Sequence, residues 1–205
     1  MTRLTHIVPC LALLTLGLTA GAQETSLPTP EVATEDQQTG SEAEAPHPLA
    51  FMFGEWTGKA TGASRDGSIY ELRQTERVGT MLDGDVVVIE GRGYDANGET
   101  AFNAFAIASP TETPGQWQMR SYMGGRSGTF PMLLTDNGFI WTTPAGPDAK
   151  MVYTATFIDG VWKEVGEYRK EGQPARPVFS MELTRKGDTD WPAGNPVDPG
   201  LTAED

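Results

Sequence analysis

The chain has 205 residues, with 28 acidic and 15 basic side chains and a formal net charge of −13 at pH 7. Its one cysteine is Cys10, and its two histidines are His6 and His47. So few thiols and imidazoles argue against a disulfide scaffold, a Cys/His zinc site and a Cys–His catalytic pair. The acidic balance argues against nucleic acid as a partner, because phosphate binding requires a basic face.

Residues 1–22 have the pattern of an export signal. Arg3 gives the N-terminus a positive charge, an apolar run follows over residues 7–18, and small residues at 20–22 match a signal-peptidase site. The run is too short to cross a bilayer as a stable helix, and Cys10 interrupts it rather than follows it, which argues against lipidation. We expect a signal peptide cleaved near Ala22 and a mature protein in the periplasm or outside the cell, with no membrane anchor.

Two acidic segments flank the middle of the chain. Residues 23–46 contain six acidic side chains and no basic one, and residues 188–205 contain five acidic side chains and no basic one. Segments this poor in apolar groups cannot bury enough surface to offset the entropy of ordering. We therefore expect a disordered acidic linker over 23–46 and a disordered acidic tail over 188–205, which serve solubility and spacing or recruit a basic partner.

Residues 47–187 have the pattern of one all-β domain. Short runs rich in β-branched and aromatic residues alternate with turn signals such as Ala96-Asn97-Gly98 and Asp159-Gly160. The pattern predicts ten strands, over residues 55–62, 68–79, 85–94, 99–108, 115–123, 126–134, 138–143, 150–158, 161–170 and 176–186. This spacing favours an antiparallel up-and-down sheet closed into a barrel, with a two-sheet sandwich as the alternative. A short helical turn from Pro48 to Phe53 is expected to plug one end.

Two-residue alternation assigns faces in part of this sheet. In residues 69–78 the more apolar face is predicted to point inward, and it consists of Tyr70, Leu72, Gln74, Glu76 and Val78. This choice places two polar side chains, Gln74 and Glu76, inside the barrel. In residues 86–94, Glu90 and Arg92 share one face while Gly91 and Gly93 share the other, and the alternation alone does not decide which face is the inner one.

Six polar side chains are the candidates for binding a ligand: Gln74, Glu76, Glu90, Arg92, Arg120 and Tyr122. Carboxylates and guanidinium groups gathered in a barrel can orient the polar end of a ligand or perform acid–base chemistry. The alternative is that Glu76, Glu90, Arg92 and Arg120 face solvent, or form internal ion pairs that fix the strand register. Of these four residues, only Glu76 is placed inside by the alternation. No serine elbow, phosphate loop or closely spaced methionine pair is present, so we predict no catalytic and no metal-binding residue.

Aromatic residues occur in successive predicted strands. They either line an apolar pocket or fill the core, because a small barrel is filled by its own side chains unless these are small enough to leave a cavity. Trp56, in the first strand, is expected to pack at the base of the barrel as a structural residue.

The first strand and several later motifs carry a family resemblance. The segment Leu49-Ala50-Phe51-Met52-Phe53-Gly54-Glu55-Trp56-Thr57-Gly58 resembles the opening of lipocalin-like barrels. Gly91-Arg92-Gly93-Tyr94-Asp95 and Asp159-Gly160-Val161-Trp162 follow in order, before Glu167-Tyr168-Arg169. The series, over about residues 47–186, resembles the DUF1579 family, whose members are often exported bacterial proteins and which is similar to nitrobindin-type calycin barrels.

The resemblance implies a fold more than a function. Nitrobindin-type proteins hold haem through a histidine late in the chain, and this sequence has no histidine after His47. Iron needs an axial donor, and methionine or tyrosine would be an unusual substitute. We therefore expect neither haem nor another cofactor.

Three hypotheses for function follow from the residues. The first is a non-catalytic, lipocalin-like barrel that binds a small, largely apolar ligand, oriented by Gln74, Glu76 and Arg92. The second is an enzyme that uses Glu76, Arg92 and Arg120 on a small acidic substrate. The third is a structural or interaction module with a filled barrel. The first requires a preformed cavity, the second requires Glu76 and Arg92 to converge, and the third requires an exposed apolar patch.

Overall fold

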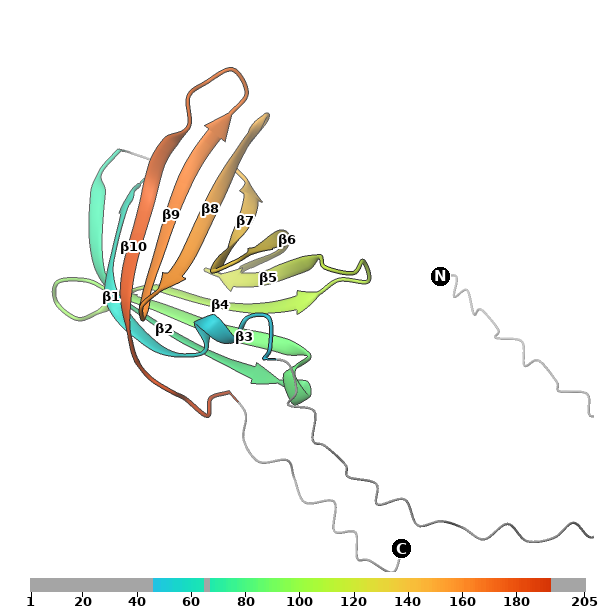
Figure 1. The fold of residues 1–205 in the computed structure, drawn as a ribbon. Helices are drawn as coiled ribbons and strands as arrows, with labels where there is room; N and C mark the ends of the chain where they lie inside the picture. Colours follow the sequence, from blue (N-terminus) through green and yellow to red (C-terminus); the bar gives the residue numbers. More distant parts are fainter. Residues whose placement is uncertain (1–45, 65–66, 193–205) are drawn as a thin grey trace, which may run out of the picture. The chain divides into compact units, whose positions relative to one another are not determined.

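Ten antiparallel strands close into a barrel in the computed structural model of the protein, which describes residues 46–64 and 67–192 (Figure 1). Each strand pairs with its neighbours in sequence, and β1 pairs with β10 to close the sheet. The strands are β1 (Gly54–Ala63), β2 (Ile69–Met81), β3 (Val86–Tyr94), β4 (Thr100–Pro110), β5 (Trp117–Met123), β6 (Arg126–Thr135), β7 (Gly138–Pro144), β8 (Ala149–Ile158), β9 (Val161–Lys170) and β10 (Arg176–Gly187). Two short 3₁₀ turns, η1 (Ala50–Met52) and η2 (Leu82–Gly84), are the helical elements of the described residues.

The barrel confirms the predicted fold class. Every predicted strand is present, with ends within about two residues of those expected, and the sheet closes on itself rather than splitting into a sandwich. The turn residues have the backbone conformation that their sequence predicts. Asp159 and Gly160 adopt φ values of 51° and 73°, as a tight antiparallel hairpin requires. The predicted signal peptide lies outside the described residues, as do the linker up to residue 45 and the tail beyond residue 192.

One glycine allows the inner faces of β2 and β3 to pack together. Gln74 and Glu76 of β2 point inward, as predicted, with 3% and 9% of their surface exposed. On β3 the inward face is the one that carries Gly91 and Gly93. Gly91 pairs with Glu76 in the register, and a Cβ atom there would lie 2.6 Å from Glu76 Oε1. The missing side chain of Gly91 therefore makes the space that the Glu76 carboxyl occupies.

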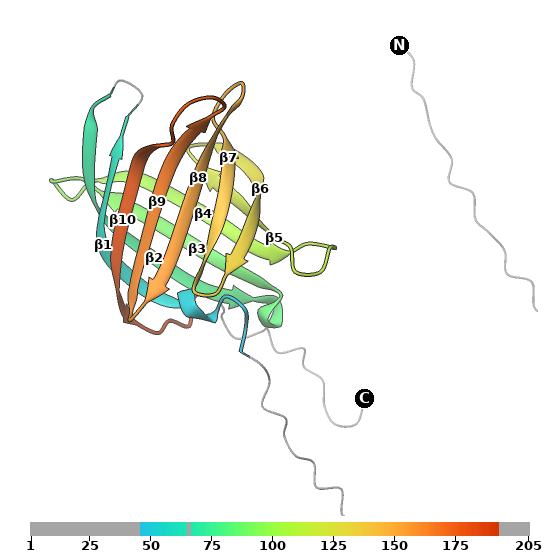
Figure 2. The same ribbon diagram turned by 45° about the horizontal axis from the view of Figure 1, so that its top comes forward.

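One end of the barrel is plugged by η1, at the point where β1 begins and β10 ends (Figure 2). Leu49 and Met52 of this turn are fully buried. The Trp56 indole donates a hydrogen bond from Nε1 to the Met52 carbonyl oxygen at 2.9 Å. Its ring meets those of Phe157 and Trp162 edge-on, with centroids 5.6 and 5.8 Å away. The helical turn and the structural role expected of Trp56 are both present.

The chain after β10 continues along the barrel wall as far as the structure describes it. The Trp191 ring lies 4.4 Å below the guanidinium of Arg77 on β2, and its carbonyl oxygen lies against Gly79. Within residues 46–64 and 67–192, no helix is long and apolar enough to span a membrane.

Truncating Trp56 should destabilise the fold strongly. Trp56→Ala removes a buried indole and its hydrogen bond to η1, and we expect a loss of about 3–5 kcal/mol in the free energy of unfolding. Leu133→Ala is the matched control, because Leu133 is 61% exposed on β6, and its loss should cost less than about 0.5 kcal/mol. Urea unfolding followed by tryptophan fluorescence and circular dichroism measures both. If the two substitutions lowered the free energy of unfolding equally, the structural role of Trp56 in holding η1 against the barrel would be contradicted.

Candidate functional site

A cavity of about 790 Å³ occupies the half of the barrel away from η1. The half next to η1 is filled by buried side chains, among them Trp56, Val78, Val87, Phe157 and Leu183. Above this filled part, the inward side chains become smaller or more widely spaced, and Gly91, Ala104 and Ser121 line empty space. The interior is therefore divided along the barrel axis into a packed base and an open chamber.

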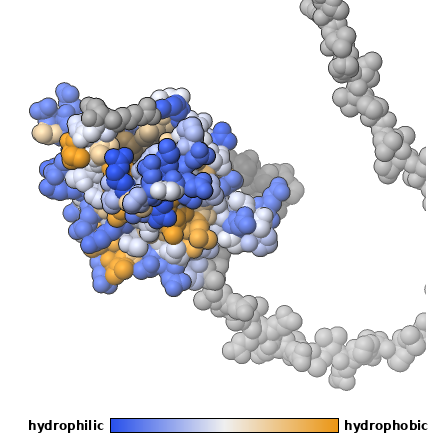
Figure 3. Space-filling model, turned by 90° about the horizontal axis from the view of Figure 1, so that it is seen from above, coloured by the Kyte–Doolittle hydropathy of each residue, from blue (hydrophilic) through white to orange (hydrophobic). Residues whose placement is uncertain are grey.

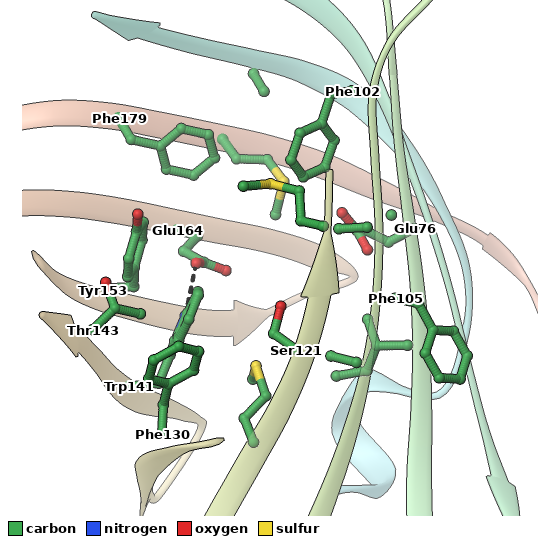
Figure 4. A pocket seen from close by; sticks show the side chains of 18 of the residues that line it. Glu76, Phe102, Phe105, Ser121, Phe130, Trp141, Thr143, Tyr153, Glu164 and Phe179 are labelled. Atoms are coloured by element: carbon green, nitrogen blue, oxygen red, sulfur yellow. Dashed lines mark hydrogen bonds between the residues drawn. The ribbon is translucent and has the colours of Figure 1, made fainter. Parts of the chain in front are cut away.

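The chamber walls are largely aromatic and thioether. Trp141 of β7 and Tyr153 of β8 are stacked, with ring centroids 4.4 Å apart and planes 15° apart. Phe130 packs against Trp141 on one side, and Phe179 packs edge-on against Tyr153 on the other. Figure 4 shows these rings on one side of the chamber and Phe102 towards the other. Figure 3, which looks down on the molecule, shows mainly hydrophilic side chains on that surface with smaller apolar areas between them.

Glu76 enters the chamber from β2. Its Oε1 accepts a hydrogen bond of 2.7 Å from Gln74 Nε2. Among the described residues, no donor other than this neutral amide bonds to the Glu76 carboxyl. Burial raises the pKa of Glu76 to about 8, the Gln74 hydrogen bond lowers it by less, and the nearby carboxylates Glu164 and Glu90 add to the rise.

Glu164 enters the chamber from β9, on the far side from Glu76 (Figure 4). Its Oε1 accepts a hydrogen bond of 3.1 Å from Trp141 Nε1. Burial raises the pKa of Glu164 to about 7, while the N–H groups of Trp141 and Trp162 act in the opposite direction. Trp162 Nε1 is buried and has no partner with hydrogen-bond geometry in the described chain. Burial beside Glu164 also raises the pKa of Tyr153 to about 12.

These two carboxyl groups share one apolar chamber and lack a cationic partner. Neither takes part in any ion pair within residues 46–64 and 67–192. An isolated carboxylate in a low-dielectric interior is costly, so each group holds its proton to a higher pH than in water. The chamber is therefore mainly apolar with two titratable oxygen groups.

Glu90 and Arg92, expected as part of the same cluster, lie on the outer face of β3. Glu90 accepts hydrogen bonds from Arg77 Nη2 at 2.7 Å and from Arg92 Nη2 at 2.6 Å. Burial alone would raise the pKa of Glu90, but the hydrogen bonds from Arg92 and Arg77 outweigh it and lower the pKa. The cluster proposed from the sequence is thus split, with Gln74 and Glu76 inside and an ion-pair network outside.

Arg120 and Tyr122 also lie on the outer face, on β5. Arg120 Nε donates a hydrogen bond of 2.8 Å to the Tyr122 hydroxyl, and its guanidinium lies 5.7 Å from the Tyr122 ring centre. The alternation of this strand turns Met119 and Ser121 inward and these two residues outward. Neither side chain reaches the chamber.

The chamber offers no imidazole or thiolate donor among the described residues. His47 lies at the plugged end, where its Nδ1 accepts a hydrogen bond of 3.0 Å from the Leu49 N–H and its ring contacts Phe53 and Trp117. No group of three or more His, Cys, Asp or Glu within residues 46–64 and 67–192 is arranged to hold a metal ion.

The fold defines the class: an antiparallel, lipocalin-like barrel with an internal chamber. The crystal structure of Rv2717c from M. tuberculosis is similar, with a TM-score of 0.52, 12% identity, and coverage of 68% of this chain and 95% of that one. The phycobiliprotein lyase CpeS from Guillardia theta aligns with a TM-score of 0.45, 11% identity, and coverage of 68% and 90%. No family model and no curated protein matches the sequence.

The buried carboxyls should make the protein less stable as the pH rises. Because the folded state keeps protons that the unfolded chain has lost above pH 4.5, unfolding free energy should fall from about pH 5 to pH 8, by about 1.4 kcal/mol per unit of pKa difference. Glu76→Gln and Glu164→Gln should each flatten this slope. Glu71→Gln, at an exposed ion pair with Lys59 on the outer face, should leave it unchanged. Denaturant titrations at several pH values measure the slopes.

Adding a methyl group at Gly91 should displace the Glu76 carboxyl. Since the new Cβ would lie 2.6 Å from Glu76 Oε1, we expect Gly91→Ala to cost about 1–3 kcal/mol. In a Glu76→Ala background the same change should cost much less, because the clashing atoms are absent. A double-mutant cycle of unfolding free energies tests this coupling, and simple additivity would refute it.

Proposed function

We propose that this protein is an exported, non-catalytic barrel that binds a small, largely apolar ligand in its chamber. The observation that carries the proposal is the chamber itself: about 790 Å³, within the range of small-molecule sites, walled by aromatic rings and with few polar groups. Export rests on the signal pattern of residues 1–22. We also propose that the chain belongs to the DUF1579 family, on the basis of the ordered motifs between residues 49 and 169.

Two features favour binding over the other hypotheses. An enzyme using Glu76 and Arg92 needs the two side chains in one concave site, yet they lie on opposite faces of the sheet. A module with a filled barrel needs an interior packed along its whole length, and only the half next to η1 is packed in this way. Ligand binding would use the chamber, which is the feature that distinguishes the half of the barrel away from η1.

Filling the chamber should abolish binding. Ser121→Trp places an indole in the chamber, whereas Thr129→Trp places the same group on the outer, exposed face of β6. We expect wild type and Thr129→Trp to enhance the fluorescence of the neutral probe N-phenyl-1-naphthylamine, and Ser121→Trp to lose most of that enhancement. Circular dichroism and thermal unfolding establish that both variants are folded.

Native mass spectrometry of the mature protein, purified from its own host without refolding, provides the second readout. A bound mass that disappears on denaturation, and is missing from Ser121→Trp, is the expected result. A bare polypeptide mass together with no response to the probe would contradict the proposal and favour the interaction module.

A further inference from the structure

The chamber contains two carboxyl groups that no cationic side chain of the described residues pairs with. Glu76 and Glu164 are each more than nine-tenths buried, and the hydrogen bonds that they accept come from an amide and an indole. Glu76 Oε2 has no hydrogen-bond donor in the described chain. The described lining has one cationic side chain, Arg126, which is exposed at the β5–β6 hairpin and pairs with neither carboxyl.

We propose that the ligand of this chamber is an organic cation: a ring-bearing or otherwise largely apolar molecule that carries a protonated amine, held by Glu76 and Glu164. The inference rests on the proposed function, since it names the chemical class that the same chamber binds. An ammonium group brings the donors and the positive charge that the two carboxylates lack. Its apolar remainder fits the aromatic walls.

The position of Glu76 shows that the fold accommodates a carboxyl at this point. The side chain lies over Gly91, where any Cβ would collide with it, and Gln74 holds only one of its two oxygens. An interior that needed only to be filled would use an apolar side chain there at lower cost, because burying a carboxyl without a counter-charge is unfavourable. The second oxygen is left to accept from a ligand.

The walls suit the rest of such a molecule. The stacked pair Trp141 and Tyr153 adjoins Glu164, with Trp141 itself donating to the carboxyl. A cation close to Glu164 therefore also lies beside aromatic rings, whose faces attract positive charge. An anionic ligand would instead meet two carboxyl groups in a low-dielectric space.

Binding should release protons, because a cation stabilises the ionised form of both carboxyls. The titratable or charged groups that face Glu76 are Glu164 across the chamber and Glu90 through the sheet. Those that face Glu164 are Tyr153 and Glu76. Arg126, at the rim, pairs with neither carboxyl, so a ligand ammonium would be the first positive charge paired with them among the described residues.

The test compares three probes that share one ring system and differ in charge. They are 1-naphthylmethylamine, 1-naphthalenemethanol and 1-naphthoate, titrated into the mature protein by calorimetry at pH 8. We expect the ammonium to bind at least tenfold more tightly than the alcohol, and the naphthoate to bind most weakly. Repeating the ammonium titration at pH 6.5 in buffers of different ionisation enthalpy should show proton release.

Matched variants assign the preference to the two carboxyls. Glu76→Gln and Glu164→Gln should each reduce the preference for ammonium over alcohol several-fold, and the double variant should abolish both the preference and the proton release. Glu71→Gln and Glu182→Gln remove carboxylates from the outer faces of β2 and β10, where they pair with Lys59 and Lys163, and should change neither. Retained binding of N-phenyl-1-naphthylamine shows that the chamber of each variant is intact.

The outcomes separate this inference from the proposed function. If the alcohol or the naphthoate binds as tightly as the ammonium or more tightly, and Ser121→Trp blocks this binding, the ligand is not an organic cation. The proposal that the barrel binds a small apolar ligand would then still hold. A preference for ammonium that survives in the double variant would also overturn it. Failure of all three probes and of N-phenyl-1-naphthylamine would count against both proposals.

Discussion

The pairing of β1 with β10 is the constraint on which the rest of the structure depends. Once the sheet closes, every strand residue faces either the interior or the outside, and alternation along the strand decides which. The closure explains why Glu90 and Glu76, on adjacent strands, have opposite surroundings. Glu90 lies outside between two guanidinium groups, which lower its pKa, and Glu76 lies inside with a neutral amide, so that burial raises its pKa. A shift of one residue in the register of β3 would turn Glu90 and Arg92 into the interior.

Closure with ten strands also leaves an interior too wide for one layer of side chains to fill. Near η1 the space is filled because large rings converge there: Phe157 and Trp162 lie 4.7 Å apart, and Trp56 meets both. In the other half, small residues face inward on neighbouring strands, and the chamber results. The packed core of the fold and the chamber therefore lie at different ends of the same barrel.

The sequence was sufficient for the strands, the turns and the inward face of β2, because apolar alternation and glycine turns are local signals. It left the face of β3 undecided, because one face carries Glu90 and Arg92 and the other carries Gly91 and Gly93. The space that Gly91 leaves for the Glu76 carboxyl is visible only in the folded barrel. Arg120 and Tyr122 were assigned to the chamber by their chemistry, although they alternate with Met119 and Ser121, which point inward. Glu164 was missed, and the signal was present: it lies two residues from Trp162, so the two share a face of β9. The width of the barrel, and therefore the volume of the chamber, depends on how the whole sheet closes. No single segment of the sequence predicts it.

The two buried carboxyls oppose the stability of this barrel, and the proposed ligand would give them a role. In the empty chamber their ionised forms are disfavoured, which keeps both pKa values raised and makes the folded state less stable as the pH rises. A ligand that carries positive charge would stabilise the ionised forms. Above the raised pKa values, where the carboxyls are charged, this interaction would add to the affinity. The same ligand would gain little from Glu90, whose charge is already matched by Arg77 and Arg92. Unpaired carboxyls inside and ion-paired carboxylates outside would direct a cationic ligand to the chamber rather than to the outer face of the barrel.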